Sequence, residues 1–397
     1  MKKNALLTLL VLLFFNCSKD SNPVENNPTE QNGPTEQNDP NEPETPPLTV
    51  IERLQQVIDE KVGDDTNKLV GVSVSIRING EEKYQLTGGL SKLNVPTEPD
   101  MRFGIGSITK TAVAATVLKL EEEGLLSLED TIGELLTLNN PNVDDSITIL
   151  QLLAHFTGVE GYFKHPDIWP RVEGNLDTAI APEELVAYIG PPINEPGITH
   201  EYSNSNYLLL GLIIEAVTGQ TVGEVMRERF WTRLQLDNIY FGSNETVLGT
   251  MATPWRDGDG DGALEDIEAE FKAAYFSVFY CAAGIYSTAS DLSMWAYHLY
   301  EGDALSGGSK TKMMTPYFLY EDSVFLGYGL GARQNRYAGH TMWGHTGGMR
   351  GYGSHMFYDP ITKVSIAVLN NQSRSEDGPL LRHELTNELL AIVFDSL

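Results

Sequence analysis

The sequence predicts an α/β protein of the α+β type, in which one antiparallel sheet is built from both ends of the folded chain. Strand-like alternation of apolar and polar residues occurs at 70–78 and returns after about residue 326. The segments between these two regions show helical periodicity instead. Because strands at both ends enclose a run of helices, we expect a sheet flanked by helices, with a helical region inserted at about 107–285. Residues 50–397 are long enough to form this domain around a core.

Residues 1–17 are typical of an export signal. Two lysines precede an apolar run from Ala5 to Phe15, which is too short to span a bilayer as a mature helix. Residues 18–49 consist mostly of Asn, Pro, Glu, Thr and Gln, and "PTEQN" occurs in them twice. Such a segment buries too little apolar surface to offset the entropy of ordering it, so we expect a disordered tether.

Cys17 stands between the apolar run and the tether. An apolar run that ends in one cysteine resembles the signal of a bacterial lipoprotein, in which Cys17 would be acylated and become the mature N-terminus. The resemblance implies a lipid anchor in a membrane of the cell envelope. Phe14-Phe15-Asn16 depart from the small residues usual in that motif, and the alternative is a secreted soluble protein with a plain signal peptide. Cys281 is the only other cysteine, so no internal disulfide is expected if Cys17 is lipidated.

The chain is strongly acidic, with a formal net charge of −28 at pH 7. Acidity of this size opposes binding to nucleic acid and to anionic membrane surfaces. It places no limit on a small-molecule or peptide substrate, which is the partner that we expect. The sequence leaves the oligomeric state open.

The elements of the folded region follow in order along the chain. Val70–Ile78 and Glu82–Gly89 are joined by Asn79-Gly80, which is the pattern of a two-residue β-hairpin. A helix is expected from Ser107 to Glu123, where Gly124 ends it. Further helices are predicted at Thr148–Phe156, Pro182–Ile189, Asn206–Thr218, Thr221–Phe230 and Ala289–Tyr300. The domain closes with four strand-like segments and a last helix, at Gly327–Ala332, Arg336–Gly348, Gly351–Pro360, Lys363–Asn371 and Leu380–Phe394.

The first chemical signal is S-x-x-K, formed by Ser107 and Lys110 at the start of the first long helix. Residues three apart on a helix share one face, so the two side chains can meet. A partly desolvated lysine has a lowered pKa and can take a proton from a serine hydroxyl, while the helix N-terminus offers N–H groups to an oxyanion. A second match, Ser309 to Lys312, lies in a polar stretch and is interpreted as a surface loop.

Two further clusters combine polar residues with a predicted element. Tyr202 and Asn204 precede an apolar helix, and Asn204 or Ser205 could cap that helix, although capping does not account for the tyrosine. The second cluster lies on or beside a strand and reads His345-Thr346-Gly347-Gly348. Glycines in a strand often mark the close approach of a ligand or another backbone, whereas a single histidine is often structural.

The order S-x-x-K, Y-x-N, H-T-G resembles the serine β-lactamase and penicillin-binding DD-peptidase superfamily. Tyrosine in the second motif and histidine in the third are most similar to one group, which holds class C β-lactamases, D-alanyl-D-alanine carboxypeptidases, D-aminopeptidases and family VIII esterases. Longer blocks such as "ITILQLLAHFTGV" and "AAGIYSTASDLSMW" also look like sequences of that group. The resemblance covers residues 51–397 and implies a β-lactamase/transpeptidase-like fold.

The resemblance also implies a two-step acyl transfer that requires no cofactor. Ser107 would attack a carbonyl, Lys110 and Tyr202 would share the proton transfers, and water would then hydrolyse the acyl-enzyme. The backbone N–H groups of Ser107 and Gly348 would hold the oxyanion. Asn204 would contact the substrate amide and help to orient Lys110.

His345 stands where many members of the group carry lysine. Lysine supplies a fixed cation for a substrate carboxylate, whereas histidine is charged only in part near neutral pH. This difference weakens the expectation of β-lactam or C-terminal carboxylate specificity. We expect a serine hydrolase similar to D-alanyl-D-alanine carboxypeptidases or D-aminopeptidases. A class C-like β-lactamase, a family VIII-type esterase and a penicillin-binding sensor with little turnover are the alternatives.

One acidic stretch lies outside this family pattern. Residues 257–268 fit D-x-[DN]-x-[DN]-G-x5-E, with Asp257, Asp259 and Asp261 as a carboxylate comb and Glu268 at the last position. Such a loop can wrap Ca²⁺, and the alternative is an acidic surface loop without a metal. Because Gly and Pro interrupt the preceding segment, a full EF-hand is not expected. Any calcium bound here would be structural rather than catalytic.

Overall fold

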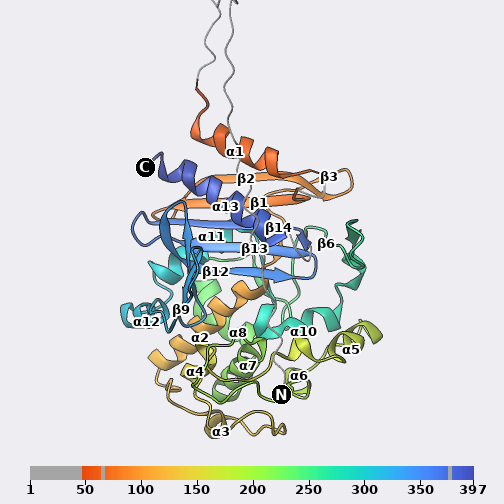
Figure 1. Cartoon of the computed structure of the whole chain (residues 1–397), viewed down its shortest axis with the longest axis vertical. Coiled ribbons are helices and arrows are strands. Elements are labelled where there is room, and N and C mark those ends of the chain that lie inside the picture. The colour runs from red at the N-terminus through yellow and green to blue at the C-terminus, as the bar shows by residue number, and fades with distance from the viewer. Residues whose placement is uncertain (1–46, 64–67, 374–377) are drawn as a thin grey trace, which may run out of the picture. The chain divides into compact units, whose positions relative to one another are not determined.

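A nine-stranded antiparallel sheet joins the two ends of the described chain (Figure 1). The computed structural model describes residues 47–63, 68–373 and 378–397. The strand order is β3-β2-β1-β14-β13-β12-β11-β10-β9, so the N-terminal β1 pairs directly with the C-terminal β14. These strands are β1 (Gly71–Ile78), β2 (Glu81–Lys92), β3 (Val95–Pro96), β9 (Phe318–Leu319), β10 (Phe325–Tyr328), β11 (Arg333–Tyr337), β12 (His340–Met349), β13 (Tyr352–Tyr358) and β14 (Val364–Asn370). The predicted α+β class is confirmed.

Helices cover both faces of this sheet, and the alternation along β1 shows why. Val74 and its even-numbered neighbours face a core shared with α1 (Val50–Lys61) and α13 (Gly378–Phe394). Ser75 points the other way and shares a hydrogen bond of 2.7 Å with Ser293 of α11 (Ala289–Tyr300). Because side chains alternate along a strand, one sequence serves both helical layers.

The remaining helices form a region beside the sheet, seen in the lower half of Figure 1. Its long helices are α2 (Thr109–Glu122) and α7 (Asn204–Thr218), and both are almost entirely buried along their length. The others are α3 (Ile132–Leu135), α4 (Ile149–Leu153), α5 (Ile168–Gly174), α6 (Pro182–Val186), α8 (Val222–Met226), α9 (Thr232–Leu234), α10 (Ala273–Ala283) and α12 (Gly307–Met313). Single turns stand at η1 (Gly106–Ile108), η2 (Tyr162–Lys164), η3 (Arg227–Trp231) and η4 (Glu268–Glu270).

The described residues also form two small three-stranded sheets. One contains β4 (Phe103–Gly104), β8 (Ile285–Ser287) and β5 (Ile239–Phe241), and it lies directly before the Ser107 turn. The other contains β15 (Gln372–Ser373), β6 (Trp255–Arg256) and β7 (Glu265–Asp266). Among the described residues, no single helix is both long and apolar enough to cross a membrane. The bent pair of helices Asn204–Thr218 and Val222–Leu234 together has the length and apolar composition of a membrane span.

Most predicted elements occur where the sequence placed them. The Asn79-Gly80 hairpin has φ angles of 53° and 81° at its two turn residues, and a capping box of Thr148 with Gln151 begins α4 within the predicted helix Thr148–Phe156. The interpretation of Ser309 as part of a surface loop is wrong. Ser309 is 4% exposed and lies in α12, whose N-cap is Ser306. The polar composition of this short helix hid the capping signal.

Candidate active site

Two glycines let the Ser107 turn approach the sheet. Gly106 has a φ of 53°, and a Cβ placed on it would lie 2.6 Å from the backbone nitrogen of Gly348. A Cβ on Gly347 would lie 2.0 Å from the carbonyl oxygen of Ile105. The Ser354 hydroxyl of β13 also donates to that carbonyl at 2.7 Å. The glycines of the predicted H-T-G motif therefore mark close backbone packing, which places Ser107 beside β12.

Lys110 is completely buried and meets three oxygen atoms. Its Nζ lies 3.2 Å from Ser107 Oγ, 2.8 Å from Asn204 Oδ1 and 2.7 Å from the Ala282 carbonyl oxygen. Burial, assisted by the charge of Arg333, holds the pKa of Lys110 well below its usual range. The amide and carbonyl oxygens can only accept, so the two N–H bonds of a neutral amine point to them. The remaining lone pair then faces the Ser107 hydroxyl.

Tyr202 lies over this cluster from the segment that precedes α7. Lys110 Nζ is 4.9 Å from the centroid of its ring. Burial raises the pKa of Tyr202 to about 12, and the neighbouring Ser107 hydroxyl opposes this rise. The Tyr202 hydroxyl is buried, and no residue that the structure describes meets it with hydrogen-bond geometry. Tyr202 therefore stays protonated near neutral pH and can donate a proton to a group that enters the site.

The alternative roles of Asn204 and Ser205 as helix caps are not observed. Ser203 occupies the N-cap position of α7 and makes no side-chain capping bond. Asn204 turns to Lys110, and the Ser205 hydroxyl donates to the Glu160 carbonyl at 2.6 Å. The Y-x-N motif thus delivers its tyrosine and its asparagine to the same lysine.

Strand β12 offers one unpaired edge beside Ser107. It pairs with β11 only as far as the Arg333 and Gly344 partners, whereas its pairing with β13 continues to Met349. Backbone groups of Thr346–Met349 on the β11 side therefore have no strand partner among the described residues. An extended substrate can pair with such an edge, as in other cases of strand addition.

His345 is buried within the protein rather than presented to this edge. It is 1% exposed, its Nε2 lies 3.2 Å from the Tyr328 hydroxyl, and its Nδ1 lies 2.6 Å from the Thr346 carbonyl oxygen. Burial, with the charge of Arg333, holds the pKa of His345 well below its ordinary value. His345 is therefore neutral and supplies no cation.

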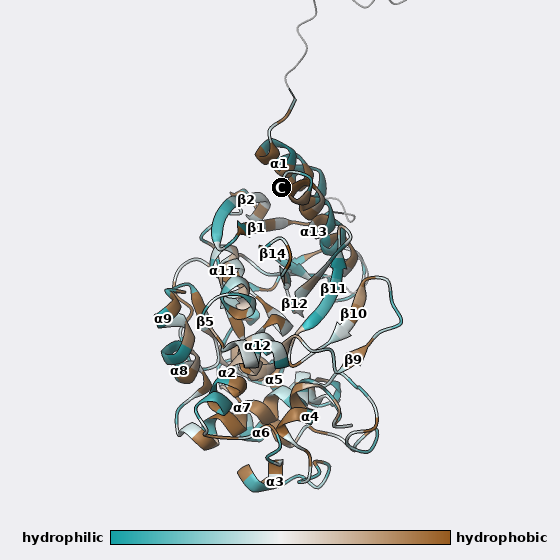
Figure 2. Cartoon of the chain, turned by 90° about the vertical axis from the view of Figure 1, so that its left-hand side faces the viewer, coloured by the Kyte–Doolittle hydropathy of each residue, from teal (hydrophilic) through white to brown (hydrophobic). Residues whose placement is uncertain are grey.

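Arg333 supplies the cation that the sequence analysis missed. It begins β11, the hydrophilic strand in Figure 2, and its Nη1 donates to Thr346 Oγ1 at 3.0 Å. Among the described residues, no carboxylate forms a salt bridge with it. No local motif signals this residue, because only the pairing of β11 with β12 brings Arg333 to the site.

A pocket of about 630 Å³ extends from this edge towards α13. Arg382, His355 and His383 lie along it, and Asp322 is the only carboxylate among its lining residues. The pocket is also lined by Thr346, Gly347 and Gly348, together with Arg333. Burial lowers the pKa of both histidines, so the cations of the lining are Arg333 and Arg382. Two arginines against one carboxylate are suited to an anionic group, in contrast to the acidic balance of the whole chain.

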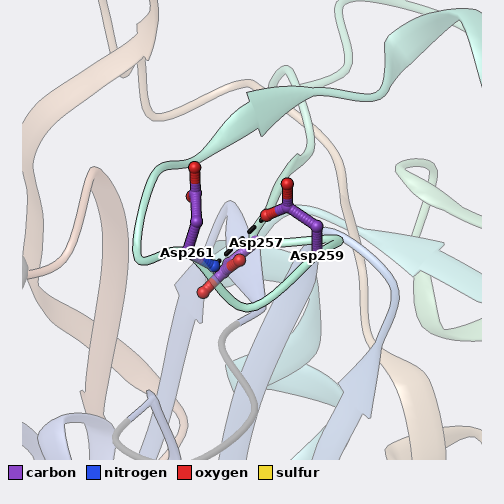
Figure 3. A group of neighbouring side chains, drawn as sticks. All are labelled: Asp257, Asp259 and Asp261. Carbon is purple, nitrogen blue, oxygen red and sulfur yellow. Dashed lines mark hydrogen bonds between the residues drawn. The ribbon is translucent and has the colours of Figure 1, made fainter.

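The acidic loop brings together three of its four predicted ligands. One oxygen from each of Asp257, Asp259 and Asp261 lies within 4.8 Å of the others, and Figure 3 shows the three carboxylates around one bend. Asp257 also accepts backbone N–H groups of its own loop. Glu268 does not belong to this group, because it lies in η4 and pairs with Lys92 at 2.9 Å. Cys17, the predicted lipidation site, lies outside the described residues.

This fold, with a serine and a buried lysine at the edge of an antiparallel sheet, is that of the β-lactamase and penicillin-binding class. The family model described as Beta-lactamase matches residues 54–390, and the chain belongs to this family. The resemblance seen in the sequence is thereby confirmed.

Individual relatives match this chain over different shares of its length. Protein flp of Staphylococcus aureus (strain MW2) is 31% identical over 197 residues, which cover 47% of this chain and 38% of that protein. A D-stereospecific amidohydrolase from Streptomyces has a TM-score of 0.73 at 25% identity, covering 84% of this chain and 97% of that one. D-amino acid amidase from Ochrobactrum anthropi SV3 has a TM-score of 0.75 at 22% identity, covering 87% and 99%. The chain thus spans less than half of the curated relative, and the last similarity shows the fold alone.

Proposed function

We propose that the protein forms an acyl-enzyme on Ser107 and releases the last residue of D-alanyl-D-alanine-type peptides, as D-alanyl-D-alanine carboxypeptidases do. The observation that carries the proposal is the Arg333 guanidinium, which lies beside Thr346 without an acidic partner among the described residues. A half-buried cation is costly when no anion compensates it, and the carboxylate of a substrate would do so. A terminal carboxylate is thus the group that distinguishes the preferred substrate.

In this scheme Lys110 starts the reaction. Its neutral amine takes the hydroxyl proton while Ser107 Oγ bonds to the carbonyl carbon of the scissile amide, and the carbonyl π electrons move to oxygen. The N–H groups of Ser107 and Gly348 hold the oxyanion that results. Asn204 and the Ala282 carbonyl keep the Lys110 amine directed at Ser107.

Tyr202 completes the first half of the reaction as the acid. When the tetrahedral intermediate collapses, the C–N bond breaks and the leaving amine takes the Tyr202 proton, which is recovered from Lys110. Water then attacks the acyl-enzyme, its proton passes to the same pair, and Ser107 leaves with a proton. This division of roles rests on the pKa values, because burial lowers that of Lys110 and raises that of Tyr202.

A second candidate is an amidase or aminopeptidase acting on D-amino acid derivatives. It is favoured by the similarity to the Streptomyces D-stereospecific amidohydrolase. An amino acid amide carries no terminal carboxylate, so the amidase activity would leave Arg333 without a role. A class C-like β-lactamase, an esterase and a penicillin-binding sensor would use the same Ser107.

Side-by-side assays separate these functions. Wild type and Ser107→Ala are tested with a D-alanyl-D-alanine peptide, the same peptide with its C-terminus amidated, nitrocefin and a p-nitrophenyl ester. The proposal predicts the highest kcat/KM for the free-acid peptide and no turnover by Ser107→Ala. Equal turnover of the free-acid and amidated peptides would favour the amidase. Efficient hydrolysis of nitrocefin alone would favour a β-lactamase, and a stable penicillin adduct without turnover would favour a sensor.

We also propose that Cys17 is lipidated and anchors the protein to a bacterial cell-envelope membrane. The support is the sequence, in which a charged start and a short apolar run end at this cysteine. Incorporation of labelled palmitate into wild type but not into Cys17→Ala would support the proposal. Equal recovery of both proteins in the soluble fraction would favour a secreted protein.

A further inference from the structure

A continuous chain of buried hydrogen bonds joins His155, Tyr328 and His345. His155 Nε2 lies 3.2 Å from the Tyr328 hydroxyl, and the same hydroxyl lies 3.2 Å from His345 Nε2. The two histidines and the tyrosine are at most 1% exposed. His155 and Tyr328 take no part in the catalytic scheme above, so their burial beside Lys110 and Tyr202 calls for a physical role.

The position of each proton in this series of hydrogen bonds can be assigned starting from His155. The backbone N–H of Ser203 donates to His155 Nδ1 at 3.1 Å, and a backbone amide can only donate. The amide nitrogen of Asn206 also lies 3.0 Å from Nδ1, while the Asn206 oxygen accepts the Thr157 hydroxyl at 2.7 Å. Nδ1 is therefore an acceptor. Burial holds the pKa of His155 well below its ordinary value, so its single ring proton lies on Nε2.

The other end leads to the same assignment. His345 Nδ1 faces the Thr346 carbonyl oxygen, which can only accept, so Nδ1 carries the proton of this neutral ring. His345 Nε2 must then accept the Tyr328 hydroxyl proton. The Tyr328 oxygen is left to accept the N–H of His155. Every donor along the chain meets one acceptor, and no second assignment satisfies both ends.

His155 also binds the residues on either side of Tyr202 in the sequence, Glu201 and Ser203. Its carbonyl oxygen accepts the N–H of Glu201 at 2.9 Å, while its ring accepts the N–H of Ser203. The ring centroids of His155 and Tyr202 are 4.5 Å apart. His155 adopts a φ of 61°, which is uncommon outside glycine and which lets its carbonyl and its ring reach the same segment.

We infer that His155 is a positioning residue with two effects. It fixes the position of Tyr202 by binding the backbone of Glu201 and Ser203. Through the Tyr328 hydroxyl, it also keeps His345 in the neutral tautomer that carries its proton on Nδ1. The inference rests on the proposed function, because Tyr202 acts as the acid there. A His345 held in this way binds no carboxylate, and this leaves anion binding to Arg333. His345 then forms the far end of a buried polar network rather than a charged subsite.

The tautomers are tested without any substrate. The protein is labelled with ¹⁵N-histidine, its eight histidines are resolved by NMR at pH 7, and signals are assigned with His155→Asn and His345→Asn variants. We expect both rings to be neutral, with the proton on Nε2 of His155 and on Nδ1 of His345. Tyr328→Phe should shift the Nε2 signal of His345 because its donor is lost. A protonated ring or the opposite tautomer at either residue would overturn the inference.

The hold on Tyr202 is tested with two substitutions that both tolerate a positive φ. His155→Asn places an acceptor oxygen near the former Nδ1, whereas His155→Gly provides none. We expect kcat of the asparagine variant to stay within about tenfold of wild type and that of the glycine variant to fall about 100-fold, with KM little changed. Equal kcat values for the two variants would refute the positioning role. A wild type without turnover of any substrate would instead refute the proposed function, while the NMR result would still decide the tautomers.

Discussion

At the scale of single residues, the environment of Lys110 decides the chemistry. A lysine in water is a cation near neutral pH and cannot accept the Ser107 proton. Complete burial and the nearby Arg333 charge lower its pKa, and two acceptor oxygens fix the direction of its lone pair. The S-x-x-K spacing predicted that the two side chains would meet. The oxygen of Ala282 was not predictable, because it comes from a segment far along the chain.

The pKa of Lys110 predicts one limb of the pH profile. Acylation of a neutral ester should fall as the pH drops through the pKa of Lys110, because the protonated amine is no base. Since Arg333 contributes to lowering this pKa, Arg333→Gln should raise it and move the acid limb to higher pH. Burial is the larger cause, so the limb should not reach the range of an exposed lysine. An unchanged limb, or one moved to lower pH, would contradict this account.

The carboxylate role of Arg333 makes a separate prediction about specificity. Loss of one charge-assisted hydrogen bond costs about 1.5–3 kcal/mol, which corresponds to roughly a 10- to 100-fold change in binding. Arg333→Gln should therefore raise KM for a free-acid D-alanyl-D-alanine peptide by that factor. The amidated peptide serves as the matched control, and its KM should change little. A similar rise for both peptides would mean that Arg333 acts through the fold rather than through the carboxylate.

At the scale of elements, the contact between η1 and β12 positions the nucleophile. This contact depends on glycines, because any Cβ on Gly106 would strike the Gly348 backbone. The sequence indicated that glycines in the third motif mark a close approach. It did not identify the partner, which is the turn that carries Ser107.

Gly106→Ala and Gly124→Ala form a matched pair for this contact. Both glycines have positive φ, at 53° and 72°, but a Cβ on Gly124 would meet nothing within 4 Å. Gly124→Ala should cost about 1 kcal/mol of unfolding free energy and leave the acylation rate unchanged. Gly106→Ala should cost more and reduce acylation by about 100-fold, because it displaces Ser107. Denaturant unfolding and acylation kinetics measure both effects, and equal rates for the two variants would contradict the role of the contact.

The acidic loop remains a prediction at this scale. If it binds Ca²⁺, adding calcium to chelator-treated protein should raise the melting temperature of wild type but not of Asp259→Ala. Glu268→Gln is the matched control, because Glu268 pairs with Lys92 and should not be needed for this stabilisation. Identical melting of wild type and Asp259→Ala with and without calcium would show that the loop binds no stabilising metal.

At the scale of the whole molecule, the two ends of the folded chain complete one sheet. The alternation of Val70–Ile78 and of Lys363–Asn371 predicted two strands, and the run of helices between them predicted that both strands belong to one sheet. Their direct pairing as β1 and β14 is a property of the fold. Helix α1 was not predicted. Its N-cap, Thr49, is the last residue of the segment 18–49, whose composition is typical of a disordered tether.

Some residues of the candidate site could be predicted from local motifs, whereas others reach it only through tertiary contacts. Ser107, Lys110, Tyr202 and Asn204 belong to recognisable motifs, and the structure brings them together. Arg333 belongs to no recognised motif, and His155 lies in a block that supported the family resemblance but carried no assigned role. They reach the site only through the β11 and β12 pairing and through a turn with positive φ, which are tertiary features. Glu268 fits the calcium pattern in sequence, but a salt bridge with Lys92 holds it elsewhere.

The central claim is that Ser107 carries the acyl group, and mass spectrometry of the intact and digested protein tests it most directly. Wild type and Ser107→Ala are exposed to a D-alanyl-D-alanine peptide and to a fluorescent penicillin, quenched with acid and digested. We predict a mass increase equal to the acyl group on the fragment that contains Ser107, and none in Ser107→Ala. An adduct on another residue, or full turnover by Ser107→Ala, would contradict the account.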